Sequence, residues 1–147
     1  MSTSMPTPCY VEELSHTAEI GLRIWAPTLA DLYTCSATAM LELIDAQPDL
    51  TAAAVERTVA VTSPDLESLL VDWLNELIFL QETTGAYWPG VTVNSLTQQE
   101  DGAALRATVR GWRTNQPPQL HIKAVTYHQL RVVAEDGGWR AEVFFDI

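Results

Sequence analysis

Basic residues are scarce in this sequence, which has eight Lys and Arg against 19 Asp and Glu among its 147 residues. The resulting net charge of −11 at pH 7 would repel a phosphate backbone over most of the surface. We therefore expect no independent nucleic-acid binding. The same charge suits a divalent cation or docking onto a basic protein, and it also simply keeps a protein in solution.

Cysteines and long apolar runs are few as well. Cys9 and Cys35 are the only cysteines, and neither belongs to a Cys-x-x-Cys pair or lies near a His at zinc spacing. This pattern predicts two reduced thiols, with neither a disulfide framework nor a zinc site. No run approaches the roughly 20 apolar residues that cross a bilayer. Because the N-terminus also lacks the charged and apolar parts of a signal peptide, we expect a cytoplasmic protein without membrane contact.

Common enzyme motifs are missing. The sequence contains no P-loop, no G-x-G-x-x-G, no G-x-S-x-G and no H-E-x-x-H. Three histidines are present, but nothing marks a nucleophile beside any of them. We predict no catalytic residues, although a hydrolase is not excluded by these absences alone.

The residues that are present predict one domain with two amphipathic helices. With 47% hydrophobic residues, the chain can bury a sizeable core, and we expect a flexible tail over residues 1–9 and one domain over 10–147. Thr28 is a suitable N-cap for a helix over about 29–45. Ser63, followed by Pro64 at the first helical position, predicts the start of a second helix that ends near Gly85.

Alternating apolar residues predict the strands. The expected strands cover 19–26, 55–62, 91–97, 103–113, 121–134 and 139–146. Most strands are consecutive in the second half of the chain, which favours an antiparallel meander. The predicted fold class is α+β, a single-domain sandwich in which two main helices pack on one face of a mostly antiparallel sheet.

Carboxylates near the last strand form a candidate metal site. The chain finishes with Phe-Phe-Asp-Ile, so Asp146 and the α-carboxylate of Ile147 can supply two adjacent anionic groups. A third carboxylate from Glu19 would complete the oxygen-rich environment that calcium, magnesium or manganese requires. On spacing alone, solvated surface carboxylates are the better interpretation. The same holds for Lys123 as a solvated strand residue and for His16 as a capping or core donor.

The second helix offers a further candidate surface. Its Trp and Leu residues recur at the spacing of a core-facing stripe. Asp72, Asn75 and Glu76 lie on the other side of this helix and are available for an exposed docking face.

Four segments together resemble the archease family. They are His16-Thr17-Ala18-Glu19-Ile20-Gly21, Leu70-Val71-Asp72-Trp73-Leu74-Asn75-Glu76-Leu77, Lys123-Ala124-Val125-Thr126-Tyr127-His128 and the stretch from Gly138-Trp139 to Phe145-Asp146-Ile147. The resemblance runs from about Tyr10 to the last residue and implies the archease-like α+β fold.

The resemblance also implies site residues. The family's metal-binding acids fall on Glu19 and Asp146, its C-terminal carboxylate falls on Ile147, and Lys123 and His16 match residues that we assign to ligase activation. The family normally has Asp where this chain has Glu19, and the extra methylene moves the carboxylate by about an ångström. Ser15 stands where some relatives carry a further acid.

The implied function is that of a protein cofactor without catalytic activity of its own. Archeases promote guanylylation and multiple turnover of RtcB-type RNA ligases in tRNA splicing or RNA repair, and these ligases use GTP and a divalent metal. Two alternatives remain open: a chaperone or adaptor for a tRNA-modifying enzyme such as a methyltransferase, and a metal-dependent hydrolase using Glu19 and Asp146 with His16 as acid or base. The sequence is equally compatible with a monomer and a homo-oligomer.

Overall fold

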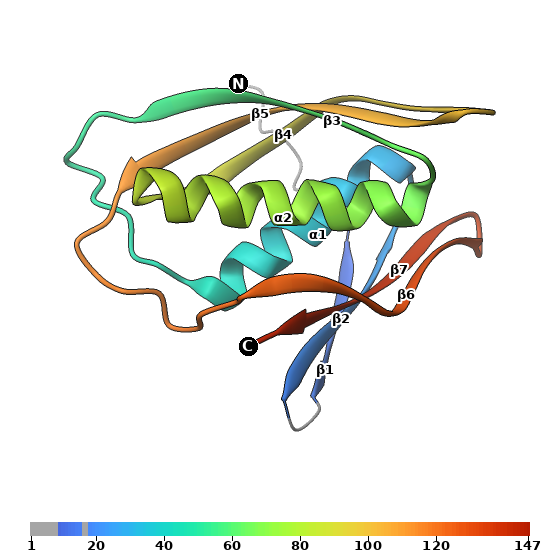
Figure 1. Ribbon diagram of the computed structural model, residues 1–147, viewed down its shortest axis with the longest axis horizontal. Coiled ribbons are helices and arrows are strands. Elements are labelled where there is room, and N and C mark those ends of the chain that lie inside the picture. Colours follow the sequence, from blue (N-terminus) through green and yellow to red (C-terminus); the bar gives the residue numbers. More distant parts are fainter. Residues whose placement is uncertain (1–8, 16–17) are drawn as a thin grey trace, which may run out of the picture.

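Two antiparallel sheets enclose two helices in the computed structural model, which describes residues 9–15 and 18–147. The elements are β1 (Tyr10–Ser15), β2 (Glu19–Ala26), α1 (Leu29–Ile44), β3 (Val55–Ser63), α2 (Leu66–Thr84), β4 (Ala86–Gln99), β5 (Gly102–Arg113), β6 (Ala124–Glu135) and β7 (Gly138–Asp146). The strand order is β1-β2-β7-β6 in one sheet and β3-β5-β4 in the other. The helices lie between the sheets (Figure 1).

The predicted fold class is confirmed, and the structure contains a second sheet on the other side of the helices. Both helices contact strands of both sheets, so they form the middle layer of the molecule instead of a cover on one sheet face. The reason is the width of their apolar surfaces, since α2 alone buries eight residues. Helices that are apolar over so much of their surface need partners on two sides.

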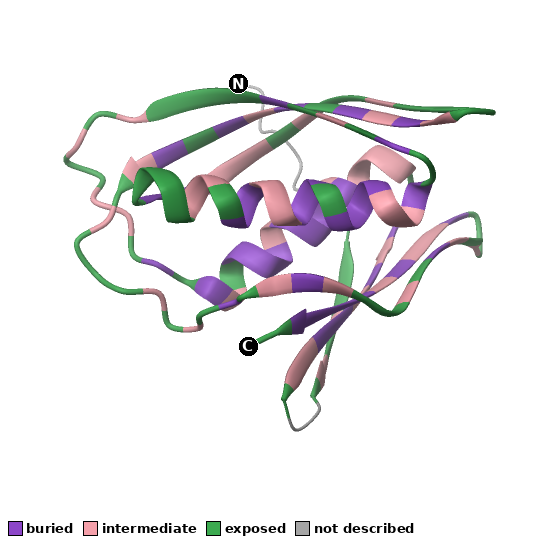
Figure 2. Cartoon of the chain, in the orientation of Figure 1, coloured by how far each residue is buried: buried purple, intermediate pink, exposed green. Residues whose placement is uncertain are grey.

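Trp73 occupies the centre of this middle layer. Its side chain is fully buried, and its indole Nε1 donates a hydrogen bond of 3.0 Å to the carbonyl oxygen of Tyr33 on α1. The hydroxyl of Tyr33 in turn donates to the carbonyl oxygen of Leu66, the first residue of α2. Burial raises the pKa of Tyr33. The two helices are therefore linked to each other by buried polar groups as well as by apolar packing. Buried residues occupy much of both helices (Figure 2).

The predicted start of the first helix is confirmed, and the predicted start of the second is wrong. Thr28 is the N-cap of α1, as expected, and its Oγ1 accepts a hydrogen bond of 3.1 Å from the Asp31 amide. For α2 the prediction is wrong by two residues, because Asp65 is the N-cap and accepts a bond of 2.7 Å from the Ser68 amide. Ser63 still ends β3, and its hydroxyl donates to Asp72 Oδ2 at 2.6 Å.

Replacing Asp65 by Ala should lower the free energy of unfolding by about 1 kcal/mol, since a helix loses that much with its capping acceptor. Asp65→Asn keeps an acceptor oxygen and is expected to stay within a few tenths of a kcal/mol of the wild type. Chemical denaturation of the two variants measures the difference. Equal stability of both variants would contradict the assignment of Asp65 as the cap.

Several strands depart from the sequence pattern, and β1 (Tyr10–Ser15) was not predicted at all. β4 begins at Ala86, five residues before the predicted strand, with a register shift between Tyr87 and Gly90. The intervening Pro89 has no amide hydrogen for the ladder, so the pattern breaks where the strand continues. β6 begins at Ala124 rather than at residue 121.

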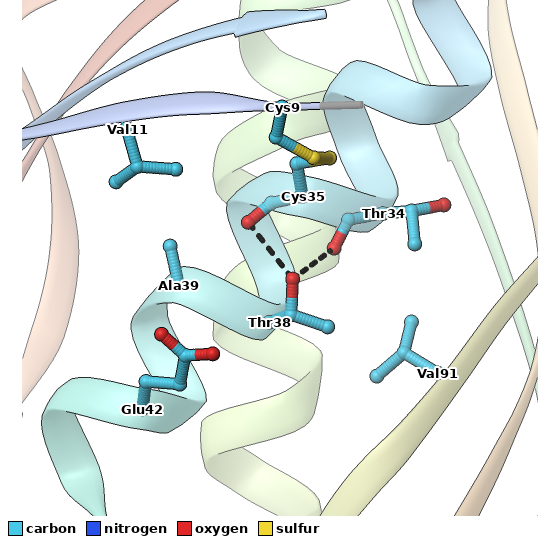
Figure 3. A pocket seen from close by; sticks show the side chains of 8 residues that line it. All are labelled: Cys9, Val11, Thr34, Cys35, Thr38, Ala39, Glu42 and Val91. Carbon is cyan, nitrogen blue, oxygen red and sulfur yellow. Dashed lines mark hydrogen bonds between the residues drawn. A yellow bond between two sulfur atoms is a disulfide. The ribbon is translucent and has the colours of Figure 1, made fainter. Parts of the chain in front are cut away.

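The prediction of two reduced thiols is wrong. A disulfide joins Cys9 to Cys35, whose Cα atoms are 6.2 Å apart, and so ties the residue before β1 to α1 (Figure 3). A cavity of about 410 Å³ lies beside it, lined among others by Thr38, Glu42 and Val91. The pairing depends on a contact between segments 26 residues apart, which spacing alone does not reveal. The rest of the predicted tail, residues 1–8, lies outside the described part of the chain.

Among the described residues, no helix is long and apolar enough to cross a membrane.

Candidate functional site

Four of the five predicted site residues lie at one end of the four-stranded sheet. Glu19 is the first residue of β2 and lies directly opposite Asp146, the last residue of β7. On the other side of β7, the Lys123 amide donates a hydrogen bond of 2.8 Å to the Asp146 carbonyl oxygen. Ile147 follows directly and is 38% exposed. Segments from both ends of the described chain thus bring these residues together.

The two carboxylates share the outer face of the sheet. Directly opposite residues in an antiparallel pair point their side chains to the same side. The neighbouring pair, Ile20 and Phe145, points the other way, and Phe145 is fully buried in the core. Glu19 is partly exposed and Asp146 is exposed. Both acids therefore face away from the helices and toward solvent.

The carboxylate donors at this site are of the chemical type that binds a hard cation. Carboxylate oxygens are the ligands that calcium, magnesium and manganese prefer. Within the described residues, no three side chains of His, Cys, Asp or Glu stand close enough together to hold a metal ion. The third donor of the predicted site is the main-chain carboxylate of Ile147, which is not a side chain. His16, predicted to act in ligase activation, lies outside the described residues.

His128 also lies next to this site, although its position in the sequence did not indicate a role there. Its Nε2 lies 4.0 Å from Glu19 Oε2, and its ring meets the ring of Phe144 edge-on at a centroid distance of 5.8 Å. The β6–β7 register shifts between Thr126 and Arg131, and Gln129 in this stretch has a φ of 52°. This irregularity in β6 gives His128 a position that regular alternation would not predict.

Gly21 and Phe144 form the apolar floor next to the acids. The two residues are opposite each other in the β2–β7 pair, one step inward from Glu19 and Asp146 on the same face. A Cβ atom on Gly21 would lie 2.5 Å from Phe144 Cε1. A side chain at position 21 would therefore displace the Phe144 ring, which is 1% exposed.

Of the three residues on α2 that were available for a docking face, Asn75 is engaged within the fold and Asp72 remains exposed. Asn75 Oδ1 accepts a hydrogen bond of 2.9 Å from the Val125 amide, and Asp72 is bonded to the hydroxyl of Ser63. Asn75 therefore fixes the first residues of β6 against the helix, next to Lys123. β6 is an edge strand, so its outward amide would otherwise lack a partner in the sheet.

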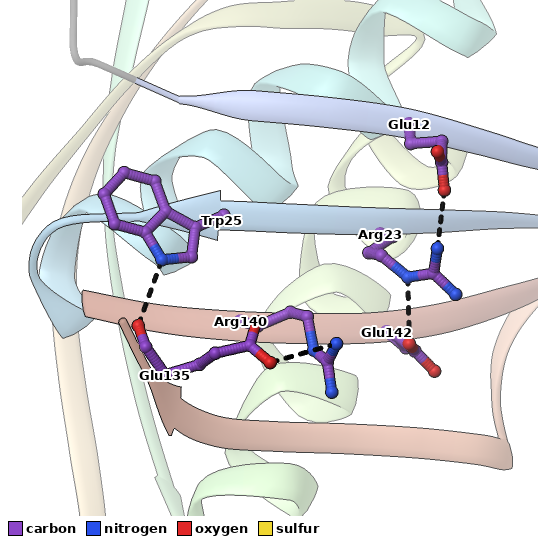
Figure 4. Close-up of polar contacts among 6 residues, drawn as sticks. All are labelled: Glu12, Arg23, Trp25, Glu135, Arg140 and Glu142. Atoms are coloured by element: carbon purple, nitrogen blue, oxygen red, sulfur yellow. Dashed lines mark hydrogen bonds and ion pairs between the residues drawn. The ribbon is translucent and has the colours of Figure 1, made fainter. Parts of the chain in front are cut away.

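Farther along the same outer face, charged residues pair with each other (Figure 4). Arg23 donates to Glu142 at 3.0 Å and to Glu12 at 2.6 Å. The hydrogen bond to Glu142 is the main reason that the pKa of Arg23 is raised. Arg140 pairs with Glu135 at 3.2 Å. Glu19 and Asp146 lie beyond this network.

Comparison with known proteins decides the family. Residues 11–147 match the model of the Archease protein family (MTH1598/TM1083). The chain belongs to the archease family. An archease from Methanosarcina mazei is 37% identical over 139 residues, which cover 92% of this chain and 94% of the relative. One from Methanopyrus kandleri is 38% identical over 141 residues, covering 92% of this chain and 98% of the relative.

Solved structures agree with the fold of this archease. Protein 1598 of Methanobacterium thermoautotrophicum, solved in solution, superposes with a TM-score of 0.74 at 30% identity and covers 93% of this chain and 98% of its own. The crystal structure of an archease from Thermotoga maritima, described as a possible chaperone, gives a TM-score of 0.61 at 22% identity over 99% of this chain and 100% of its own. The second likeness concerns the fold alone.

Proposed function

We propose that this archease activates an RtcB-type RNA ligase in tRNA splicing or RNA repair by promoting ligase guanylylation and multiple turnover. The observation that carries the proposal is the direct pairing of Glu19 with Asp146 beside Lys123. These are the positions to which the family resemblance assigns metal binding and activation. Family membership supports the proposal independently of that geometry.

The residues that would hold the metal are Glu19, Asp146 and the carboxylate predicted at Ile147. A calcium, magnesium or manganese ion bound there would supply positive charge that can neutralise phosphate oxygens. The carboxylates repel one another without a cation, so they favour its binding. The Lys123 amide is bonded to the Asp146 carbonyl, so the Lys123 side chain begins from backbone that lies next to the acids.

An open sheet face explains why a partner is needed. Both acids lie on the outer surface, where water screens charges and weakens electrostatic stabilisation. Docking onto the ligase would cover the acids and place them against its guanylylation site. In this proposal the ligase performs the covalent chemistry, and the archease contributes charge and orientation.

A chaperone function is the second candidate. The Thermotoga relative is described as a possible chaperone, and an adaptor for a tRNA-modifying enzyme such as a methyltransferase would need a protein-binding surface and no metal. The two candidates differ in how they depend on the acids at the end of the four-stranded sheet. Metal removal therefore separates them.

The experiment is ligase guanylylation and multiple-turnover ligation by the cognate ligase, with and without this protein. We expect the wild type to raise both rates. Pre-treating the archease with a chelator and then removing the chelator should lose the stimulation, and adding back a divalent metal should restore it. Stimulation that persists without metal would contradict the metal-dependent mechanism, and no stimulation at all would favour the chaperone.

A further inference from the structure

Positive charge in this acidic protein is concentrated in one sheet. The three strands β3, β4 and β5, all fully described, contain four arginines and a single acidic residue, Glu56. The chain has only eight Lys and Arg against 19 Asp and Glu. The three-stranded sheet therefore has the opposite charge from the rest of the molecule.

Two of these arginines project from the outer face of the central strand. Along β5, Leu105, Ala107 and Val109 are buried against the helices, whereas Arg106 and Arg110 alternate with them and are exposed. At a rise of about 3.4 Å per residue, the two Cα atoms lie roughly 13 Å apart. Both arginines thus stand in one row on a face that no helix covers (Figure 1).

The arginines in this row form no ion pair with an acid among the described residues. Within the described residues, neither Arg106 nor Arg110 has a carboxylate within 4.0 Å, whereas Arg23 and Arg140 on the other sheet are both paired. The guanidinium of Arg110 lies 5.2 Å from the ring centroid of Trp112, the next residue in the row. A partly exposed aromatic ring and two guanidinium groups without a carboxylate partner therefore share this surface.

The side chains around the row are small and mostly hydroxyl-bearing. Neighbouring outward positions on all three strands are occupied by Thr58, Thr62, Thr92, Ser95, Thr97 and Thr108, and the acid Glu56 lies opposite Arg110. Phosphate oxygens are bound mainly by Arg, Ser, Thr and Asn side chains and backbone amides. Protein interfaces also favour Arg and Trp, but Ser and Thr are under-represented among the residues that dominate their binding energy. The composition of this face fits a phosphodiester backbone better than a protein partner.

We propose that the outer face of β3-β5-β4 binds the backbone of single-stranded RNA through Arg106 and Arg110, with Trp112 as a stacking surface for a base. Basic strands that follow a backbone, combined with aromatic rings, are the usual elements of single-strand binding. The choice of RNA as the polymer rests on the proposed function. This departs from the expectation, drawn from the net charge of −11, that the protein binds no nucleic acid on its own. Repulsion from acids on the rest of the surface is largely screened beyond about 10 Å at 0.1 M salt, so the charge of this face can dominate locally.

This face lies on the opposite side of the molecule from Glu19 and Asp146. The candidate metal site is on the outer surface of the four-stranded sheet, and the helices separate the two sheets. One protein molecule could therefore dock onto the ligase with one sheet while the other sheet holds an RNA strand.

The test is binding of a short fluorescein-labelled oligouridylate to the isolated full-length protein, followed by anisotropy at several salt concentrations. Two phosphate contacts predict a slope of log K against log salt of about −1.4, which is about a sevenfold loss of affinity between 50 and 200 mM salt. Each of the variants Arg106→Ser and Arg110→Ser should reduce the slope by about 0.7. Arg106→Lys combined with Arg110→Lys should keep the slope, because the charges remain.

The control is Arg131→Ser, which removes one exposed arginine from the other sheet and changes the net charge equally. An equal effect of Arg131→Ser would overturn the proposal, because the binding would then reflect overall charge. Binding of a fluorescein-labelled polyglutamate peptide, with no binding of the oligouridylate, would overturn it in favour of an acidic protein partner. The assay contains no ligase, so its result does not depend on whether the protein activates one.

Discussion

Replacement of Asp146 by Ala is expected to abolish stimulation of ligase guanylylation while leaving the fold intact. Asp146 is exposed and contributes its carbonyl oxygen, not its side chain, to the bond with the Lys123 amide. Loss of even an outer partner of a metal ligand costs about 10–100-fold in affinity or activity, so loss of a ligand should cost at least as much. The measurement is the guanylylation rate of the ligase over a range of metal concentrations.

The matched control for Asp146→Ala is Asp136→Asn. Asp136 is an exposed acid in the β6–β7 turn, at the opposite end of the same strand pair, and Asn tolerates its φ of 50°. This variant loses the same charge and should stimulate the ligase like the wild type. Full stimulation by a folded Asp146→Ala protein would refute the role of the acid pair. Equal loss in both variants would indicate a non-specific effect of charge.

Replacement of Trp73 by Ala is expected to produce the largest loss of stability, about 3–5 kcal/mol in the free energy of unfolding. Trp73 is fully buried between the sheets, so its removal leaves a cavity that the surrounding side chains cannot fill. It also leaves the carbonyl of Tyr33 without its indole donor. Urea denaturation followed by circular dichroism measures the change.

Phe79 provides the control on the same helix. Its side chain is 56% exposed, so Phe79→Ala should change the free energy of unfolding by no more than about 0.5 kcal/mol. Both variants alter helix propensity in the same direction. A loss of less than 1 kcal/mol in Trp73→Ala would mean that the middle layer is not the main source of stability.

Local periodicity was sufficient to predict most of the elements. Residues 29–44 and 66–84 form the two expected helices because their apolar residues recur at helical spacing. β2 matches its predicted range of 19–26 for the corresponding reason, the alternation of a strand. Each of these patterns involves residues only a few positions apart, so it can be recognised in a single sequence.

Features that depend on distant segments were not predictable in the same way. The Cys9–Cys35 disulfide and the burial of both helices between two sheets follow from how the elements pack. The N-cap of α2 was misplaced because Ser63 and Asp65 are both good caps, and only the backbone decides between them.

The candidate site likewise depends on contacts between segments that are distant in the sequence. Spacing favoured solvated carboxylates for Glu19 and Asp146, and only the family resemblance indicated a site there. Their direct pairing is a property of the β2–β7 register, and the position of His128 is a property of the β6 irregularity. Neither can be read from the residues that flank them in the chain.

The strand order of the four-stranded sheet has a consequence for biosynthesis. β1 and β2 are made first and β6 and β7 last, yet β2 pairs directly with β7. Such long-range pairings must wait until both partners have left the ribosome, and they close slowly. Glu19 therefore has no Asp146 beside it until the final strand emerges. A chain stopped before β7 lacks Asp146, so the acid pair can form only after β7 has been made.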